Sequence, residues 1–218
     1  MRKDEWDWIN RHLPEGRISL LDIGCGNGAL LNALGDRIEY GAGVDKSEAI
    51  LEKARKRNAA RTNLEFSSIN SPSLPFEDEK FDVVISLMSF RYLDWDSLMK
   101  EVRRVAKRGG IFLVVDMVTV PVRPAEYPQL VRDKIRTVVH QKSNPTFSNN
   151  LRRLVGHPDW KTMLKYNPIR SEHEMKWYLE SRFPGRKMEL LNIGWNARIV
   201  AFDSGPVEHS LEVKLTYP

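Results

Sequence analysis

This chain of 218 residues has almost no cysteine and no long apolar run. Its one cysteine, Cys25, excludes an internal disulfide and favours a reducing compartment. No run of about 18 apolar residues occurs, so no segment is expected to span a membrane. The first six residues are largely charged and lack the apolar region of a secretory signal. Together these absences predict a cytoplasmic location with no membrane partner.

Histidine is also scarce, and its spacing does not suit a metal. The five histidines form neither an H-E-x-x-H motif nor a paired metal spacing, so no metal site is predicted. The chain also has no internal repeat and no low-complexity tract. Its length suffices for one well-buried α/β domain but not for a second full domain beside it. We therefore expect a single domain over residues 1–218.

The chain does contain an apolar strand followed by alternating glycines. Residues 18–23, with Asp22 set among apolar side chains, lead into residues 24–28, where every second residue is glycine. A helix-compatible run, residues 29–34, follows at once. This order indicates a buried strand, a tight turn and a helix start, where backbone N–H groups and the helix dipole face a ligand. Glycine suits such a turn because it adopts unusual φ and ψ values and lets a ligand approach. A tight turn without a ligand is the alternative.

Two ligand classes fit this loop. The spacing Gly24-x-Gly26-x-x-Ala29 satisfies the fingerprint G-x-G-x-x-[G/A], which indicates NAD or FAD. Counted from Asp22, the loop also has the pattern D-x-G-x-G-x-G. This pattern resembles motif I of the class I S-adenosylmethionine-dependent methyltransferases. Their cofactor carries a cationic sulfonium and a free amino-acid end, and an acid at the strand end suits positive charge. The second pattern is therefore favoured.

Downstream segments extend the resemblance. A short strand ends in Asp45, whose carboxylate can accept both ribose hydroxyls of an adenosine cofactor. Residues 64–76 and 81–93 resemble the third and fourth strands of the small-molecule, type 11-like group of these methyltransferases. In that group an acid after the third strand binds the adenine amino group. This place falls on Asn70 here, whose carbonyl can still accept the hydrogen bond.

The resemblance covers residues 17–117 continuously and residues 171–203 more weakly, and it implies a cofactor site. The cofactor that the resemblance implies is S-adenosyl-L-methionine. Cys25 is expected to be a small packing residue, because no histidine lies near it in sequence to make it a nucleophile. The implied cofactor-binding residues are Asp22, Gly24, Cys25, Gly26, Asn27, Gly28, Asp45, Lys46, Asn70, Ser71 and Leu87.

The alternation of strands and helices predicts an α/β fold with a parallel sheet and right-handed crossovers. The resemblance implies a Rossmann-like sheet of seven mostly parallel strands with helices on both faces, its last strand antiparallel. A capping box at Ser171 is expected to open a late helix that ends near residue 183. The expected strands run over residues 17–23, 40–45, 64–67, 81–86, 110–117, 187–193 and 198–202, with a helix at 96–106.

The resemblance does not explain residues 118–170. Ten basic residues and three acidic residues give this segment a net charge of +7, whereas the whole chain carries +5. Six prolines divide it, so we expect a mainly helical insertion after the fifth strand. Such an insertion lies beyond the carboxyl ends of the strands, where open α/β sheets bind ligands. We therefore expect a basic lid on a core formed by residues 16–117 and 171–203.

Three functions fit a basic lid beside this loop. The preferred one is methyl transfer to a small, anionic acceptor gripped by arginines. An RNA-directed methyltransferase is the second, because a basic stripe is the electrostatic footprint of nucleic acid. A non-catalytic S-adenosylmethionine-binding module is the third, left open by the departure at Asn70 and by Arg91, which stands where many relatives carry histidine. A merely solvated basic surface is the alternative for the charge itself.

No catalytic residue is predicted, because methyl transfer from a sulfonium needs mainly an aligned nucleophile. His140 and His157 are candidate bases within the insertion. Arg91 is expected either to orient an anionic acceptor or to pair with Asp94 or Asp96. The sequence indicates no oligomeric state.

Overall fold

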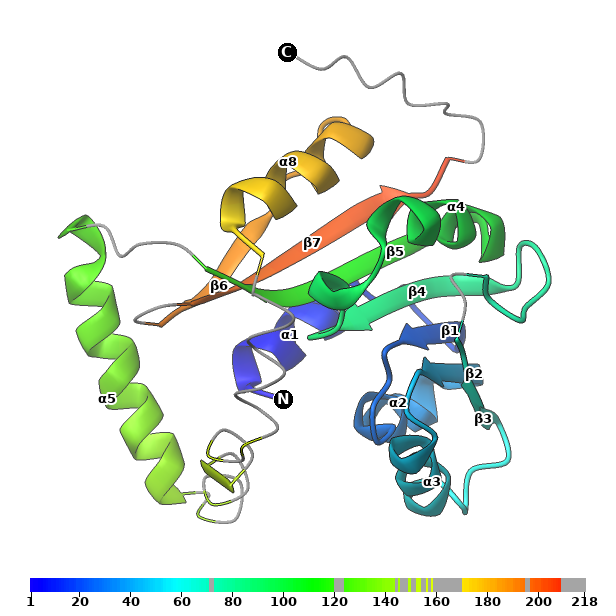
Figure 1. Cartoon of the computed structure of the whole chain (residues 1–218), viewed down its shortest axis with the longest axis horizontal. Coiled ribbons are helices and arrows are strands. Elements are labelled where there is room, and N and C mark those ends of the chain that lie inside the picture. Colours follow the sequence, from blue (N-terminus) through cyan, green and yellow to red (C-terminus); the bar gives the residue numbers. More distant parts are fainter. Residues whose placement is uncertain are drawn as a thin grey trace.

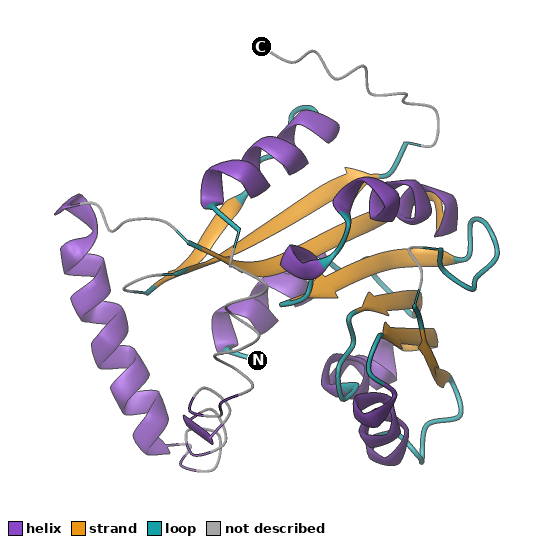
Figure 2. Cartoon of the chain, viewed as in Figure 1, coloured by secondary structure: helices purple, strands orange, loops and turns teal. Residues whose placement is uncertain are grey.

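Seven strands form one sheet in the computed structural model of the chain (Figures 1 and 2). The structure describes residues 1–70, 73–119, 124–143, 170–194 and 197–208, with six isolated positions between 145 and 158. The strand order is β3-β2-β1-β4-β5-β7-β6. The strands are β1 (Ile18–Ile23), β2 (Ile38–Asp45), β3 (Leu64–Ser68), β4 (Phe81–Leu87), β5 (Ala106–Val118), β6 (Glu189–Ile193) and β7 (Arg198–Pro206).

The sheet is parallel except at β7. The five strands β1 to β5 pair with one another only in parallel. Strand β7 runs antiparallel to both of its neighbours, β5 and β6. The predicted fold class, a Rossmann-like mostly parallel sheet with an antiparallel last strand, is therefore confirmed. In such a sheet the parallel strands all end at one edge, and this edge brings distant segments together.

Helices cover both faces of the sheet (Figure 1). Side chains alternate along a strand, so Leu21 packs with the helices of one face and Leu20 with those of the other. Helices α4 and α8 lie on the first face, and α1, α2 and α3 on the second. The helices are α1 (Lys3–His12), α2 (Ala29–Leu34), α3 (Glu48–Arg57), α4 (Trp95–Val105), α5 (Tyr127–Ser143) and α8 (Glu172–Arg182), with short 3-10 turns η1 (Gly35–Arg37), η2 (Phe90–Tyr92) and η3 (Pro124–Glu126).

Several element boundaries and one helix differ from the sequence-based expectation. Strand β5 begins at Ala106 and not at residue 110, because Ala106 already pairs with Phe81 before a register shift in β4. Helix α1 was not expected at all. It buries Trp8 and Ile9, and the Glu5 side chain accepts a hydrogen bond from the Arg2 backbone N–H at 2.8 Å. Ser171 is confirmed as the N-cap of α8, since its side chain accepts from the Glu174 N–H at 3.1 Å. The predicted capping box is only half formed, because the Glu174 carboxylate pairs with Arg170.

The expected insertion, residues 118–170, is described only in part. It contains η3 and the seventeen-residue helix α5, which stands beyond the end of the sheet in Figure 1. Most of residues 144–169 lie outside the described residues, including the candidate base His157. The helical character of the whole insertion and its role as a lid therefore stay predictions.

Candidate cofactor site

The predicted cofactor-binding residues gather at the carboxyl ends of four adjacent strands. The glycine loop follows β1, Asp45 ends β2, Asn70 follows β3 and Leu87 ends β4. Because β3, β2, β1 and β4 are neighbours in that order, these ends form one continuous edge. The structure thus brings together residues that are spread over more than sixty positions of the sequence.

Two of the loop glycines are required for different reasons. Gly24 has a φ of 77°, and a Cβ there would lie 2.3 Å from the Cβ of Ser89. The Ser89 hydroxyl donates to the Gly24 carbonyl at 2.9 Å, so this glycine serves packing against the segment after β4. Gly26 has a φ of 52°, yet a Cβ on it would meet no atom within 4 Å. Gly26 is therefore the loop glycine whose backbone faces open space, where a ligand can approach.

The loop is fixed to β2 by backbone hydrogen bonds. The N–H groups of Gly24 and Cys25 both donate to the Val44 carbonyl, at 2.8 and 3.0 Å. The Gly26 N–H donates to Asp45 Oδ2 at 3.0 Å, and the Ser47 N–H donates to Asp45 Oδ1 at 3.0 Å. Each carboxylate oxygen of Asp45 keeps a further acceptor site, because an ionised carboxylate offers about four. Asp45 is thus held in place and can still accept hydroxyl groups.

Asp22 is buried beneath this loop. Only 2% of its surface is exposed, and its Oδ1 atom has no hydrogen-bond partner. Burial, followed by the nearby charge of Asp45, raises the pKa of Asp22 to about 7. Two carboxylates close together with one oxygen unpaired create a negative potential. Such a site suits a ligand that brings a positive charge.

Cys25 is a buried packing residue within the loop. Only 8% of its surface is exposed, and it belongs to the hydrophobic cluster on the α1, α2 and α3 face. Burial and the neighbouring Asp22 charge both raise the pKa of its thiol. A protonated, buried thiol is a poor nucleophile, which supports the packing role expected from the sequence.

The remaining predicted residues occupy the rim of the site. Asn70 is exposed and follows Ile69, whose N–H donates to the Asp45 carbonyl at 3.1 Å. Lys46 is exposed, and Asn27 and Leu87 are partly buried. Of the other predicted cofactor-binding residues, Gly28 is the N-cap of α2, and Ser71 lies outside the described residues.

These residues fit S-adenosylmethionine. The unpaired oxygen of buried Asp22 could face its positive charge, and the Asp45 carboxylate could accept hydrogen bonds from the ribose hydroxyls. The open backbone at Gly26 gives the ligand room between them. A dinucleotide needs the helix N-terminus to receive a pyrophosphate, and two acids near that position, buried Asp22 and partly exposed Asp45, disfavour a dianion.

Arg91 has a partner that the sequence did not predict. Its guanidinium pairs with Asp116 of β5, and its backbone N–H donates to Asp116 Oδ2 at 2.7 Å. Both residues are buried, with 7% and 0% of their surfaces exposed. The expected partners Asp94 and Asp96 are wrong: Asp96 pairs instead with Arg182 at 2.6 Å. The Arg91 charge is thus already neutralised, so it gives no free cation for an acceptor.

Two supporting residues escaped sequence-based reasoning. Ser89 donates to the carbonyls of Gly24 and Leu87, joining the ends of β1 and β4. Asn58 is 3% exposed, donates to the Ala54 carbonyl at 2.8 Å and accepts from Asn32 at 2.9 Å. A Cβ on Gly28 would lie 2.7 Å from its amide nitrogen. A small polar residue after a strand was the only signal for Ser89, and Asn58 gave none.

A buried ion cluster lies at the base of the insertion. Arg198, 3% exposed, donates to Glu126 at 2.7 and 2.6 Å and to Glu172 at 2.7 Å. Glu126 lies in η3 near the start of the insertion, and Glu172 lies just after its end. We call these three residues the Arg198 cluster. It joins the two ends of the insertion to β7.

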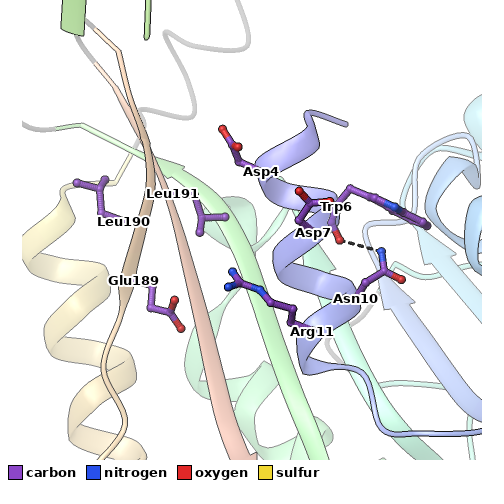
Figure 3. Close-up of a pocket in the computed structure, with 8 residues that line it drawn as sticks. All are labelled: Asp4, Trp6, Asp7, Asn10, Arg11, Glu189, Leu190 and Leu191. Carbon is purple, nitrogen blue, oxygen red and sulfur yellow. Dashed lines mark hydrogen bonds between the residues drawn. The ribbon is translucent and has the colours of Figure 1, made fainter. Parts of the chain in front are cut away.

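An open groove of the described residues lies elsewhere. It measures about 710 Å³ and runs between α1 and the edge strand β6 (Figure 3). In Figure 3, Arg11 of α1 points toward the strand that carries Glu189 and Leu191. A smaller cavity of about 340 Å³ is lined by α4, α8 and the end of β7. Neither is lined by a predicted cofactor residue. Among the described residues, no cluster of three or more histidines, cysteines or acids gathers as metal ligands.

Comparison with known proteins gives the same class as the geometry. Residues 21–114 match the protein family described as Methyltransferase domain. A sterol 4-C-methyltransferase of Caenorhabditis elegans is 29% identical over 130 residues, which are 56% of this chain and 37% of that protein. A demethylmenaquinone methyltransferase of Lactococcus lactis is 35% identical over 105 residues, 45% of this chain and 42% of that protein. The chain thus matches less than half the length of these two relatives.

The fold is also similar to that of a solved methyltransferase structure. The solved structure of geranyl diphosphate C-methyltransferase from Streptomyces coelicolor aligns with a TM-score of 0.64 at 15% identity, covering 94% of this chain and 78% of that one. The likeness to this structure lies in the fold. Residues 21–114 match a methyltransferase domain, in agreement with the resemblance found in the sequence. S-adenosylmethionine is its cofactor.

Proposed function

We propose that this protein transfers a methyl group from S-adenosylmethionine to a small, anionic acceptor bound beside the basic insertion. The observation that carries this proposal is a buried carboxylate, Asp22, that feels the charge of Asp45, which itself binds the open backbone of Gly26. When bound, the cofactor supplies an electrophilic methyl group on a sulfonium. The protein's own contribution is to position the acceptor in line with this methyl group, and such alignment supplies much of the acceleration.

Each of the predicted cofactor residues then has a proposed role. Asp22 stabilises the positive end of the cofactor, and Asp45 accepts hydrogen bonds from the ribose hydroxyls. Asn70, on the rim next to Asp45, accepts from the adenine amino group. Ser89 and Asn58 act on these residues indirectly by fixing the loop. These roles are supported by the shared strand edge and by the loop's hydrogen bonds.

The acceptor is proposed from charge and from relatives. The insertion carries a net charge of +7, and Arg152 and Arg153 are exposed. Arg91 is paired with Asp116, so the insertion and not Arg91 is the proposed source of cations for the acceptor. The sterol and demethylmenaquinone methyltransferases among the relatives are named for small-molecule acceptors, which favours a small molecule over RNA.

Transfer of a labelled methyl group tests the proposal. The full chain is incubated with S-adenosylmethionine labelled in its methyl group and with a cell extract separated into small anionic, small neutral and RNA fractions. Label is expected in the small anionic fraction. Neutralising the basic pair in Arg152→Gln/Arg153→Gln is expected to reduce that labelling several-fold while the affinity for the demethylated cofactor stays the same.

Other results would contradict one level of the proposal each. Label in RNA, lost steeply with salt, would identify an RNA-directed enzyme. Label in the neutral fraction would contradict the anionic acceptor. No transfer to any fraction, with the cofactor still bound, would indicate a non-catalytic binding module. Arg55→Gln/Arg57→Gln on α3, with the same change of charge, serves as the control variant.

A further inference from the structure

Exposed apolar side chains concentrate on one helix. Of the eight large hydrophobic residues that the described part of the chain exposes, five lie on α5. Three of them, Val131, Ile135 and Val138, are 58%, 60% and 43% exposed. Their spacing of four and three residues places them on one face of the helix. We call these three residues the α5 stripe. Tyr127 and Val139, which are 50% and 58% exposed, extend it.

Helix α5 is anchored in the protein near its start. Among the residues of this helix whose burial is described, Leu130, 3% exposed, is the one buried in the core. It lies about 100° around the helix from Val131, so the α5 stripe lies on a different face of the helix from that anchor. Helix α5 also contacts β6, and Figure 1 shows it standing beyond the end of the sheet. A helix with a well-exposed apolar face usually meets another surface.

The charged residues beside the α5 stripe indicate what kind of surface the helix meets. At 100° per residue, Arg132 and Lys134 flank the α5 stripe on its two sides, and both are exposed. Long basic side chains beside an apolar stripe extend toward phosphate groups while the stripe enters the acyl region. Stacking two copies of α5 through the stripe would bring like charges together, which disfavours a dimer.

We propose that α5 docks this protein on an anionic membrane surface, lying in the interface with the α5 stripe inserted. None of the helices in the described part of the chain has the length and apolar character needed to span a bilayer, so the contact is peripheral. Helix α5 follows the carboxyl end of β5, and the glycine loop lies at the same edge of the sheet. Docking would therefore present the candidate cofactor edge to the membrane. The proposal stands on α5 and does not depend on the proposed methyl acceptor.

Vesicle flotation tests it with the full chain. The protein is mixed with vesicles of phosphatidylcholine alone or with about one third phosphatidylglycerol. We expect binding to the anionic vesicles only, and weaker binding at about 0.5 M salt because screening shortens the range of the attraction. The variant Val131→Glu/Ile135→Glu is expected to bind the anionic vesicles at least about tenfold more weakly, because both side chains lose their apolar insertion.

A charge-matched control separates insertion from net charge. Ala60→Glu/Thr62→Glu adds the same two charges at exposed positions between α3 and β3. Its binding should stay within about threefold of wild type, since these charges lie away from α5. Binding of S-adenosylhomocysteine shows that each variant is folded and that the cofactor site is intact. If the glutamate variant does not fold, Val131→Ser/Ile135→Ser takes its place with the same expectation.

Three results would overturn the proposal. The first is that the wild type, with the cofactor product bound, floats with neither kind of vesicle. The second is that the stripe variant and the control lose vesicle binding equally, which would leave only a net-charge effect. The third is that the wild type is a dimer by light scattering and the stripe variant a monomer, which would assign the α5 stripe to a second copy of the chain. Loss of cofactor binding would contradict the proposed function, whereas loss of vesicle binding alone would contradict only this inference.

Discussion

Two acids of the candidate cofactor site differ in their surroundings. Asp45 ends a strand, is partly exposed and accepts two backbone hydrogen bonds. Asp22 is buried with one oxygen unpaired, and its pKa is raised to about 7. Asp45 is therefore tested by mutation and ligand binding, and Asp22 by the pH dependence of stability. Each difference can be measured.

Asp45→Ala is expected to weaken binding of S-adenosylhomocysteine by about 1.5–3 kcal/mol, the range for hydrogen bonds to a charged group. Calorimetric titration measures this change. Glu39→Ala removes an exposed carboxylate from the same strand and should have no effect. An unchanged affinity in folded Asp45→Ala would show that the ribose is held by other residues.

Asp22 is expected to make the cofactor-free protein less stable as pH rises. Its pKa is about 7 in the folded protein, whereas an ordinary aspartate, as in the unfolded chain, has a pKa of 3.8. The folded state therefore holds this proton more tightly, and the stability that it contributes below about pH 4 is lost as pH rises through 7. Asp22→Asn cannot titrate, so denaturant unfolding at pH 5 and pH 8 should show a smaller fall than wild type. Asp36→Asn, at an exposed side chain, is the control. An equal fall in wild type and Asp22→Asn would mean that Asp22 does not titrate in this range.

Sequence identified the residues with local signals and missed those with distant partners. The glycine spacing and the acids at strand ends lie within short windows, so Asp22 and Asp45 were predicted. Arg91 was expected to pair with a near neighbour, but the sheet places Asp116 beside it from the next strand. A contact between adjacent strands depends on strand order, which residue spacing alone does not give.

At the scale of elements, the strands were predicted more reliably than the helices. Buried parallel strands are continuous apolar runs, and residues 18–23 and 81–86 are clear examples. Helix α1 was missed because it buries its apolar side chains mainly at Trp8 and Ile9, too few for a periodic pattern. The contacts of α5 were not predictable either, since its apolar stripe faces away from the core.

The Arg198 cluster links several elements, and removing its cation should have a large effect. Arg198→Met removes the buried cation that donates to Glu126 and Glu172, both of which are partly buried. We expect the free energy of unfolding to fall by about 3–5 kcal/mol, the range for a buried charge that loses its partner. Urea unfolding measures it.

Two further variants distinguish this cause from a packing defect. Adding Glu126→Gln and Glu172→Gln to Arg198→Met should restore much of the lost stability, because no charge is then left buried. Arg61→Met breaks the exposed pair with Asp36 and should change stability by less than about 1 kcal/mol. If the triple variant is no more stable than Arg198→Met, packing and not charge explains the loss.

At the scale of the whole molecule, the insertion is separable from the cofactor edge. Its two ends meet: the Thr119 N–H donates to the Arg170 carbonyl at 3.0 Å, and the Glu172 N–H donates to the Thr119 carbonyl at 3.1 Å. Arg198 also keeps its bond to Glu172 when Glu126 is absent. The core can thus be closed across the base of the insertion.

Replacing residues 120–169 with a short glycine linker is expected to abolish methyl transfer, since the proposed acceptor site is removed. Binding of S-adenosylhomocysteine should stay within a few fold, because the cofactor residues all precede residue 117. Both are measured on the same preparation, by transfer of label and by calorimetry. Retained transfer would show that the insertion is not the lid, and lost cofactor binding in a folded protein would show that it supports the cofactor site.

The central claim is that Asp22, Gly26 and Asp45 form a site for a positively charged adenosine cofactor and not for a dinucleotide. Calorimetric titration of the full chain with S-adenosylmethionine, S-adenosylhomocysteine and NAD tests it most directly. Binding of the two sulfur compounds with no detectable binding of NAD is the predicted result. Tighter binding of NAD than of S-adenosylhomocysteine would contradict it.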